Sequence, residues 1–146
     1  MGQSRPVLKV KRLRPEARLP TRATDGSSGM DLYACLDGDL TLGPDPVLVP
    51  TGIAIELPPG YEAQVRPRSG LSAQGVAVVF GTIDADYRGE VLVTMHTVGT
   101  RPPYTVHHGD RIAQLVLARV VTLPLVESDT LSPTGRGAGG HGSTGR

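Results

Sequence analysis

Three carboxylates, a guanidinium and one of only four tyrosines lie within residues 81–90, with Gly81 at the start and Gly89 near the end. The glycines indicate a main chain that turns sharply or approaches a ligand closely. Apolar runs at residues 76–80 and 91–95 flank the segment and predict strands that hold it in place. A hairpin with a charged, solvated edge would have the same composition. The segment alone therefore leaves a reactive site and an ordinary turn both open.

Three further clusters combine glycines with charged or amide side chains. They are residues 26–32, 66–71 and 109–115. Asp31 stands at the start of a predicted strand, and Arg68 with Ser69 opens a predicted helical turn, where free N–H groups favour a phosphate. Gln114 lies in an otherwise apolar run, and burying its amide unpaired would cost about 1–3 kcal/mol. Each feature also has a purely structural explanation. Asp31 could be an ordinary turn residue, Arg68 and Ser69 could cap a helix, and the Gln114 amide could bond to a neighbouring main chain.

The last fifteen residues, 132–146, are rich in glycine, serine and threonine and cannot pack a core. Such a tail either has no function or forms a mobile arm whose glycines bring N–H groups close to phosphates. Arg136, Ser143 and Thr144 would then be further donors, and His141 would offer a flat ring. We divide the chain into a barrel domain, residues 1–127, and a flexible arm, residues 128–146.

The composition limits the function classes. The chain has 146 residues, enough for one domain with its own core, and the single Cys35 can form no intrachain disulfide. The net charge of +1 gives no strong attraction to nucleic acid or to an anionic membrane, and no apolar run is long enough to span a bilayer. We expect a cytoplasmic protein with neither partner. With no Trp and one Phe, the core must be aliphatic, which favours an oligomer.

The elements that must position these residues are mostly strands. Thirteen prolines and nineteen glycines interrupt nearly every stretch that could form a long helix, apart from a helical turn at residues 69–74. Further predicted strands are residues 7–13, 47–49, 53–57, 61–65 and 112–121. The runs 53–57 and 61–65, separated by Pro58-Pro59-Gly60, predict a hairpin. Many short strands spaced by turns predict an all-β, jelly-roll-like sandwich or barrel.

Five segments, in this order, closely resemble the five motifs of the homotrimeric deoxyuridine triphosphatases (dUTPases). They are residues 29–32, 67–71, 81–90, 111–115 and 136–145. Each motif alone is weak, whereas their joint order and spacing over residues 7–145 are specific. The resemblance implies a homotrimer with three sites at subunit interfaces, each closed by the glycine-rich arm of another chain.

The resemblance also implies the reaction and the residues that perform it. Water attacks the α-phosphorus of dUTP with the help of Mg²⁺, giving pyrophosphate and dUMP, which lowers dUTP and supplies dUMP for thymidylate synthesis. Asp84 is implied as the general base, and Asp31 as a contact to Mg²⁺ through a coordinated water. The implied substrate-binding residues are Arg68, Ser69, Gly70, Val78, Thr82, Ile83, Asp84, Tyr87, Gln114, Arg136, His141, Gly142, Ser143 and Thr144.

Nucleotide selection is implied for the hairpin around residues 81–90. Its main chain would pair with uracil, while Tyr87 would pack beneath the deoxyribose and reject a 2′-hydroxyl. Strict strand alternation puts Asp84 and Tyr87 on opposite faces, so both can serve one site only with a bend or bulge between them or with both contacts made from the inner edge of the turn. Two residues depart from the family pattern: Val78 replaces a frequent Asn, and His141 replaces the usual Phe. We therefore expect main-chain groups of residues 78–80 to read the base and His141 to stack on it.

Two other functions fit parts of the pattern. A dCTP deaminase has the same general fold, but the catalytic Glu and Thr-Leu-Glu segment of that family do not follow Asp84. A nucleotide-binding trimer without catalysis would lack the base or the arm, whereas Asp31, Asp84 and Arg136 are all present. The basic residues near the N-terminus alternate with Val10 and Leu13, as on a solvated strand face rather than a nucleic-acid surface. These residues are Lys9, Lys11, Arg12 and Arg14.

Overall fold

A computed structural model describes residues 5–142, which form ten strands and one short helix. In chain order they are β1 (Lys9–Arg12), β2 (Gly29–Tyr33), β3 (Leu40–Leu42), β4 (Val47–Glu56), β5 (Tyr61–Arg66), α1 (Ser69–Ala73), β6 (Val76–Val78), β7 (Gly81–Ile83), β8 (Glu90–Thr97), β9 (Tyr104–Val106) and β10 (Arg111–Arg119). The all-β prediction and the single helical turn are confirmed.

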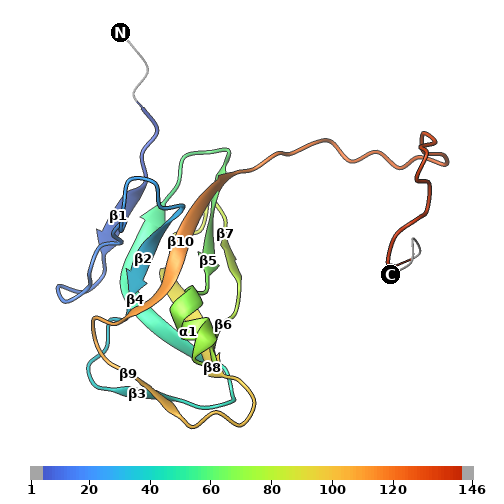
Figure 1. Cartoon of the computed structure of the whole chain (residues 1–146). Helices are drawn as coiled ribbons and strands as arrows, with labels where there is room; N and C mark the ends of the chain where they lie inside the picture. Colours follow the sequence, from blue (N-terminus) through green and yellow to red (C-terminus); the bar gives the residue numbers. More distant parts are fainter. Residues whose placement is uncertain (1–4, 143–146) are drawn as a thin grey trace.

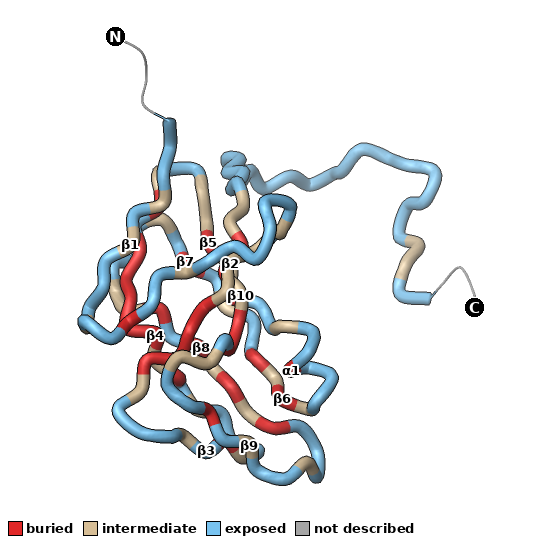
Figure 2. Tube along the Cα trace, turned by 60° about the vertical axis from the view of Figure 1, so that its left-hand side comes forward, coloured by how far each residue is buried: buried red, intermediate tan, exposed pale blue. Residues whose placement is uncertain are grey.

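Two four-stranded antiparallel sheets form the body of the protein (Figure 1). One has the strand order β1-β4-β8-β6 and the other β2-β10-β5-β7, while the ribbon β3-β9 lies at the lower end of the view. Alternation along the strands fills the space between the sheets: Val91, Val93 and Met95 of β8 are at most 1% exposed. Figure 2 shows these buried segments gathered inside the body. The core is largely aliphatic, as the composition predicts.

The predicted hairpin of residues 53–57 and 61–65 is wrong. Strands β4 and β5 follow each other in the chain but belong to different sheets, because β4 pairs with β1 and β8 whereas β5 pairs with β10 and β7. Both strands alternate, and each contributes inward side chains such as Ile55 and Val65 to the same core. Alternation reports which face of a strand is buried, and it does not report which strand lies beside it.

Strand β4 also joins two strands that the sequence analysis kept apart. Pro50 lies inside it, and the register with β8 shifts between Pro50 and Ala54. An irregular register accommodates a residue that has no N–H to donate to the ladder. Gly52, within this irregularity, has a φ of 70°.

After β10 the described chain forms no helix or strand and runs away from the body (Figures 1 and 2). Its apolar side chains are largely exposed. They include Val121, Leu123, Leu125, Val126 and Leu131, each at least 80% exposed. No helix within residues 5–142 is both long and apolar enough to cross a membrane.

Candidate active site

Arg68 connects the start of α1 to two neighbouring strands. It has extended backbone angles (φ −95°, ψ 136°) and occupies the N-cap position, directly after β5 and Pro67. Its Nη1 donates a hydrogen bond to the main-chain carbonyl of Arg111 at 3.1 Å. Its Nε lies 3.6 Å from Oδ1 of Asp31, whose side chain is only 17% exposed. The guanidinium is therefore held against β2 and β10 beside the first turn of the helix.

Gln114 lies opposite Asp31 in the pairing of β10 with β2. Its Nε2 donates to the main-chain carbonyl of Pro67 at 3.0 Å, so the amide has the main-chain partner that the sequence analysis left open. Arg111 is close to the same carboxylate, with Nε 3.9 Å from Oδ2 of Asp31. Arg111 was not among the predicted site residues, although it belongs to the same motif as Gln114.

One carboxylate thus stands between two guanidinium groups, which leaves an excess positive charge suited to phosphate oxygens. Ser69 and Gly70 begin the helix beside them. A cavity of about 540 Å³ borders Arg68 and Arg111 and is also lined by His107. His107 accepts or donates a hydrogen bond at 2.8 Å with Asp39, and this contact raises the pKa of the imidazole.

The second part of the site lies where β7 ends. Ile83 is the last residue of the strand, and the chain then turns, with the N–H of Tyr87 donating to the carbonyl of Asp84 at 3.1 Å. Thr82, Ile83, Asp84 and Tyr87 consequently line one cavity of about 220 Å³. The expected bend between Asp84 and Tyr87 is present, and it removes the conflict that strict alternation would create.

The two apolar runs that flank residues 81–90 form β6 and β8, which pair antiparallel as a hairpin around that segment requires. Strand β6 pairs with β8 and strand β7 with β5, so residues 79–80 cross from one sheet to the other. The Val78 side chain is 8% exposed and packs in the core, and the N–H of Val79 donates to the carbonyl of Thr94 at 2.9 Å. A role for Val78 in binding would fall to its main chain, because its side chain faces the interior.

The two parts of the site are far apart within one chain. Ile83 pairs with Ala63, whereas Asp31 and Gln114 share a row with Arg66, which is three residues farther along β5. With about 3.3 Å per residue and about 4.8 Å between strands, the main chains of Ile83 and Asp31 are about 17 Å apart. Asp84 therefore does not lie beside the Arg68 cluster of its own chain.

The arm residues form a third group, away from both. Arg136 donates through Nε to the carbonyl of Gly139, and the N–H of Gly137 donates to Oγ1 of Thr134 at 3.1 Å. His141 has a φ of 51° and is followed by Gly142. The arm extends away from the sheets in both views (Figures 1 and 2). Ser143 and Thr144 lie outside the described residues.

The comparisons with known proteins agree on one family. A sequence model of the dUTPase family matches residues 15–145. The deoxyuridine 5'-triphosphate nucleotidohydrolase of Desulfotalea psychrophila is 56% identical over 131 residues, covering 87% of each chain. The enzyme of the same name from an Anaeromyxobacter species is 51% identical over 144 residues, covering 96% of each.

Solved structures give the same result. The dUTPase of Staphylococcus bacteriophage 80alpha, solved with dUPNHPP, has a TM-score of 0.82 and 26% identity, covering 96% of this chain and 99% of that one. An Asp-to-Asn variant of the phage phi11 dUTPase, described as coordinating a structural Mg(II) ion, has a TM-score of 0.77 and 23% identity, covering 85% and 97%. At that identity the second structure shows the shared fold.

Proposed function

The chain belongs to the dUTPase family and hydrolyses dUTP to dUMP and pyrophosphate, and we propose that it does so at sites shared between the subunits of a homotrimer. The separation of the site supports this assembly: the main chains of Ile83, which precedes Asp84, and of Asp31, which contacts Arg68, are about 17 Å apart across one sheet. The water that Asp84 orients must reach the α-phosphorus of the same triphosphate that the Arg68 cluster holds. A second copy of the chain can place its Arg68 cluster beside Asp84 of the first.

We assign the role of general base to Asp84. The observation that carries this assignment is the shared cavity, in which Asp84 and Tyr87 face the same space. A carboxylate there can orient a water and accept its proton as the water attacks the α-phosphorus. The water adds directly to phosphorus, so no bond forms between the protein and the substrate.

The Arg68 cluster is proposed to hold the triphosphate. Arg68 and Gln114 are fixed by main-chain carbonyls, so their remaining N–H groups are already oriented when the substrate arrives. Ser69 and Gly70 add donors at the start of α1. Together these groups stabilise the charge that develops on the leaving pyrophosphate. Arg111, beside Asp31, adds a second guanidinium to the same cluster.

The residues around Asp31 fit a magnesium ion bound mainly by the substrate. Asp31 contributes one carboxylate, and the described residues contain no group of three or more metal-ligating side chains. Mg²⁺ keeps several waters and is often held by one carboxylate together with substrate phosphates. When bound, the ion would neutralise phosphate charge. Asp31 would orient one of its coordinated waters while keeping contact with Arg68.

Selection of the nucleotide is proposed for the cavity beside β7. Tyr87 would pack against the deoxyribose, and main-chain groups of residues 79–83 would pair with uracil. Arg136, His141 and Gly142, with Ser143 and Thr144, would close over the bound nucleotide as an arm, residues 128–146, while residues 1–127 form the barrel. A location in the cytoplasm, where free nucleotides occur, belongs to the same proposal.

Pyrophosphate release from dUTP, dCTP, dTTP and UTP with Mg²⁺ tests this assignment. We expect the parent to release pyrophosphate from dUTP and much more slowly from the other three nucleotides. Asp84→Asn should lower kcat for dUTP by about 10²–10⁴-fold. Circular dichroism and sedimentation of the variant would verify that it folds and assembles like the parent. Ammonia release from dCTP, or turnover unaffected by Asp84→Asn, would overturn the assignment.

A further inference from the structure

We propose that Gly89 is a positioning residue for Tyr87, and that it thereby sets how strongly the enzyme rejects a ribonucleotide. The inference rests on the proposed contact of Tyr87 with the deoxyribose. It goes beyond that contact, because it says which residues fix the ring in place and which substitution would move it.

The first observation is the space at Gly89. A Cβ atom built on Gly89 would lie 2.4 Å from Oη of Tyr87, 2.6 Å from Cζ and 3.0 Å from Cε1. Two of these three distances are shorter than carbon and oxygen atoms tolerate without one of them moving. The phenol end of the ring therefore lies directly on the Gly89 main chain. Any side chain at position 89 would have to displace it.

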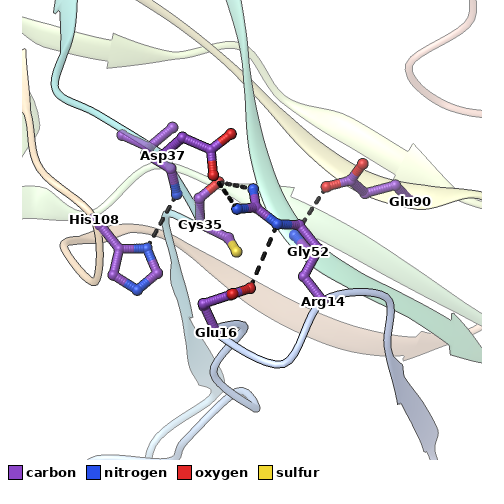
Figure 3. Close-up of polar contacts among 8 residues, drawn as sticks. Arg14, Glu16, Cys35, Asp37, Gly52, Glu90 and His108 are labelled. Atoms are coloured by element: carbon purple, nitrogen blue, oxygen red, sulfur yellow. Dashed lines mark hydrogen bonds and ion pairs between the residues drawn. The ribbon is translucent and has the colours of Figure 1, made fainter.

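The second observation is the hydrogen bond at the end of the ring. Oη of Tyr87 donates to the main-chain carbonyl of Glu90 at 2.8 Å, and Glu90 is the first residue of β8. The carboxylate of Glu90 in turn accepts a hydrogen bond from the N–H of Gly52 at 2.9 Å (Figure 3). Glu90 is thus anchored to β4 as well as β8. The ring of Tyr87 is held by packing on one side and by a fixed acceptor at its tip.

The position of the ring matters because it forms a wall of the cavity. Tyr87 remains 43% exposed, and the cavity beside it also contains Asp84. A steric filter distinguishes a 2′-hydrogen from a 2′-hydroxyl only while the wall stays close to the sugar, and such filters are worth about 10–200-fold in kcat/KM. A Cβ at Gly89 would push the phenol away from Glu90 and open this wall.

The test measures kcat/KM for dUTP and UTP in Gly89→Ala and in a matched glycine variant. Gly38→Ala is the control, because its Cβ would meet no atom within 4 Å and its φ lies outside the left-handed region. We expect Gly89→Ala to lower the dUTP/UTP ratio of kcat/KM at least about 10-fold. Gly38→Ala should leave the ratio unchanged. An unchanged ratio in Gly89→Ala would overturn the inference.

A double-mutant cycle with Tyr87→Ala separates this inference from the function on which it rests. If Tyr87→Ala does not lower the ratio, the proposed sugar contact is wrong. If Tyr87→Ala lowers it, the inference requires that Gly89→Ala have no further effect in the Tyr87→Ala background. A further loss there would show that Gly89 acts elsewhere and would overturn the inference.

The same cycle covers poor folding of Gly89→Ala. Removing the Tyr87 ring also removes the atoms that the new Cβ meets. Gly89→Ala should therefore lower the melting temperature less in the Tyr87→Ala background than in the parent. An equal loss of melting temperature in both backgrounds would contradict the proposed contact.

Discussion

Asp31 and Arg68 form an ion pair at 3.6 Å that joins the middle of β2 to the start of α1. The two residues are 37 positions apart, and the pairing of β2 with β10 brings them together, since Gln114 lies opposite Asp31 and bonds to Pro67. This pair keeps the carboxylate and the guanidinium in one orientation. The substrate therefore meets an arrangement that needs little further ordering.

Substitution of Asp31 by Asn should weaken the response to Mg²⁺. The amide keeps the shape of the side chain but loses the charge that would hold a coordinated water, and residues in such supporting positions affect metal affinity by about 10–100-fold. Pyrophosphate release titrated with Mg²⁺, and calorimetric binding of Mg²⁺ with a non-hydrolysable dUTP analogue, would measure the change. Asp37→Asn, which removes an exposed partner of Arg14, serves as the control. An unchanged Mg²⁺ titration of Asp31→Asn would contradict the assigned role.

Mixing two inactive variants should restore activity if sites are shared between chains. Asp84→Asn damages the cavity part of the site and Arg68→Ala damages the phosphate part, and these parts lie about 17 Å apart in one chain. Co-folded mixtures would contain sites in which an intact Asp84 meets an intact Arg68. We expect clear recovery of dUTP turnover in the mixture and none when either variant is folded alone.

Sedimentation of the parent protein provides the accompanying check. A monomer with normal turnover would refute the shared site. Variants that form mixed trimers without recovering activity would show that the two parts of each site come from the same chain.

The sequence predicts local elements better than the way they pair. The short helix follows from Pro67 and the glycines around it. Asp84, Arg68 and Gln114 lie in local motifs, and their roles in the site stay predictions. Strands β4 and β5 belong to different sheets, and alternation could not reveal this. The same alternating pattern fits two strands paired in a hairpin and two strands in facing sheets. Arg111 was missed because its approach to Asp31 depends on strand register.

Replacement of Gly29 by Ala should disturb Gln114. A Cβ at Gly29 would lie 2.5 Å from Oε1 of Gln114, so the side chain would have to leave its present position and its bond to Pro67. Loss of one such hydrogen bond is worth about 1 kcal/mol, and we expect a rise of about five-fold in KM for dUTP. Gly26→Ala is a fitting control because nothing lies within 4 Å of its Cβ. Equal KM values for the two variants would argue against this contact.

The contact between His107 and Asp39 should make stability depend on pH. The hydrogen bond to Asp39, followed by the charge of that carboxylate, raises the pKa of His107 above its usual value of about 6.5. The contribution is fully present below the unfolded pKa and disappears as the pH rises through the folded value. Melting temperatures of the parent and Asp39→Asn should therefore differ near pH 5.5 and converge at alkaline pH. Asp129→Asn, in the exposed arm, should melt at the same temperature as the parent at both pH values.

Replacement of His141 by Phe should preserve or improve binding of dUTP. The proposed role of this residue is to stack on the base once the arm closes, and a phenyl ring offers at least as much stacking surface as an imidazole. KM for dUTP should stay level or fall in His141→Phe. His141→Ala should raise it about ten-fold, because stacking on a base is worth about 1–3 kcal/mol. A large rise in KM for His141→Phe would show that His141 does more than stack on the base.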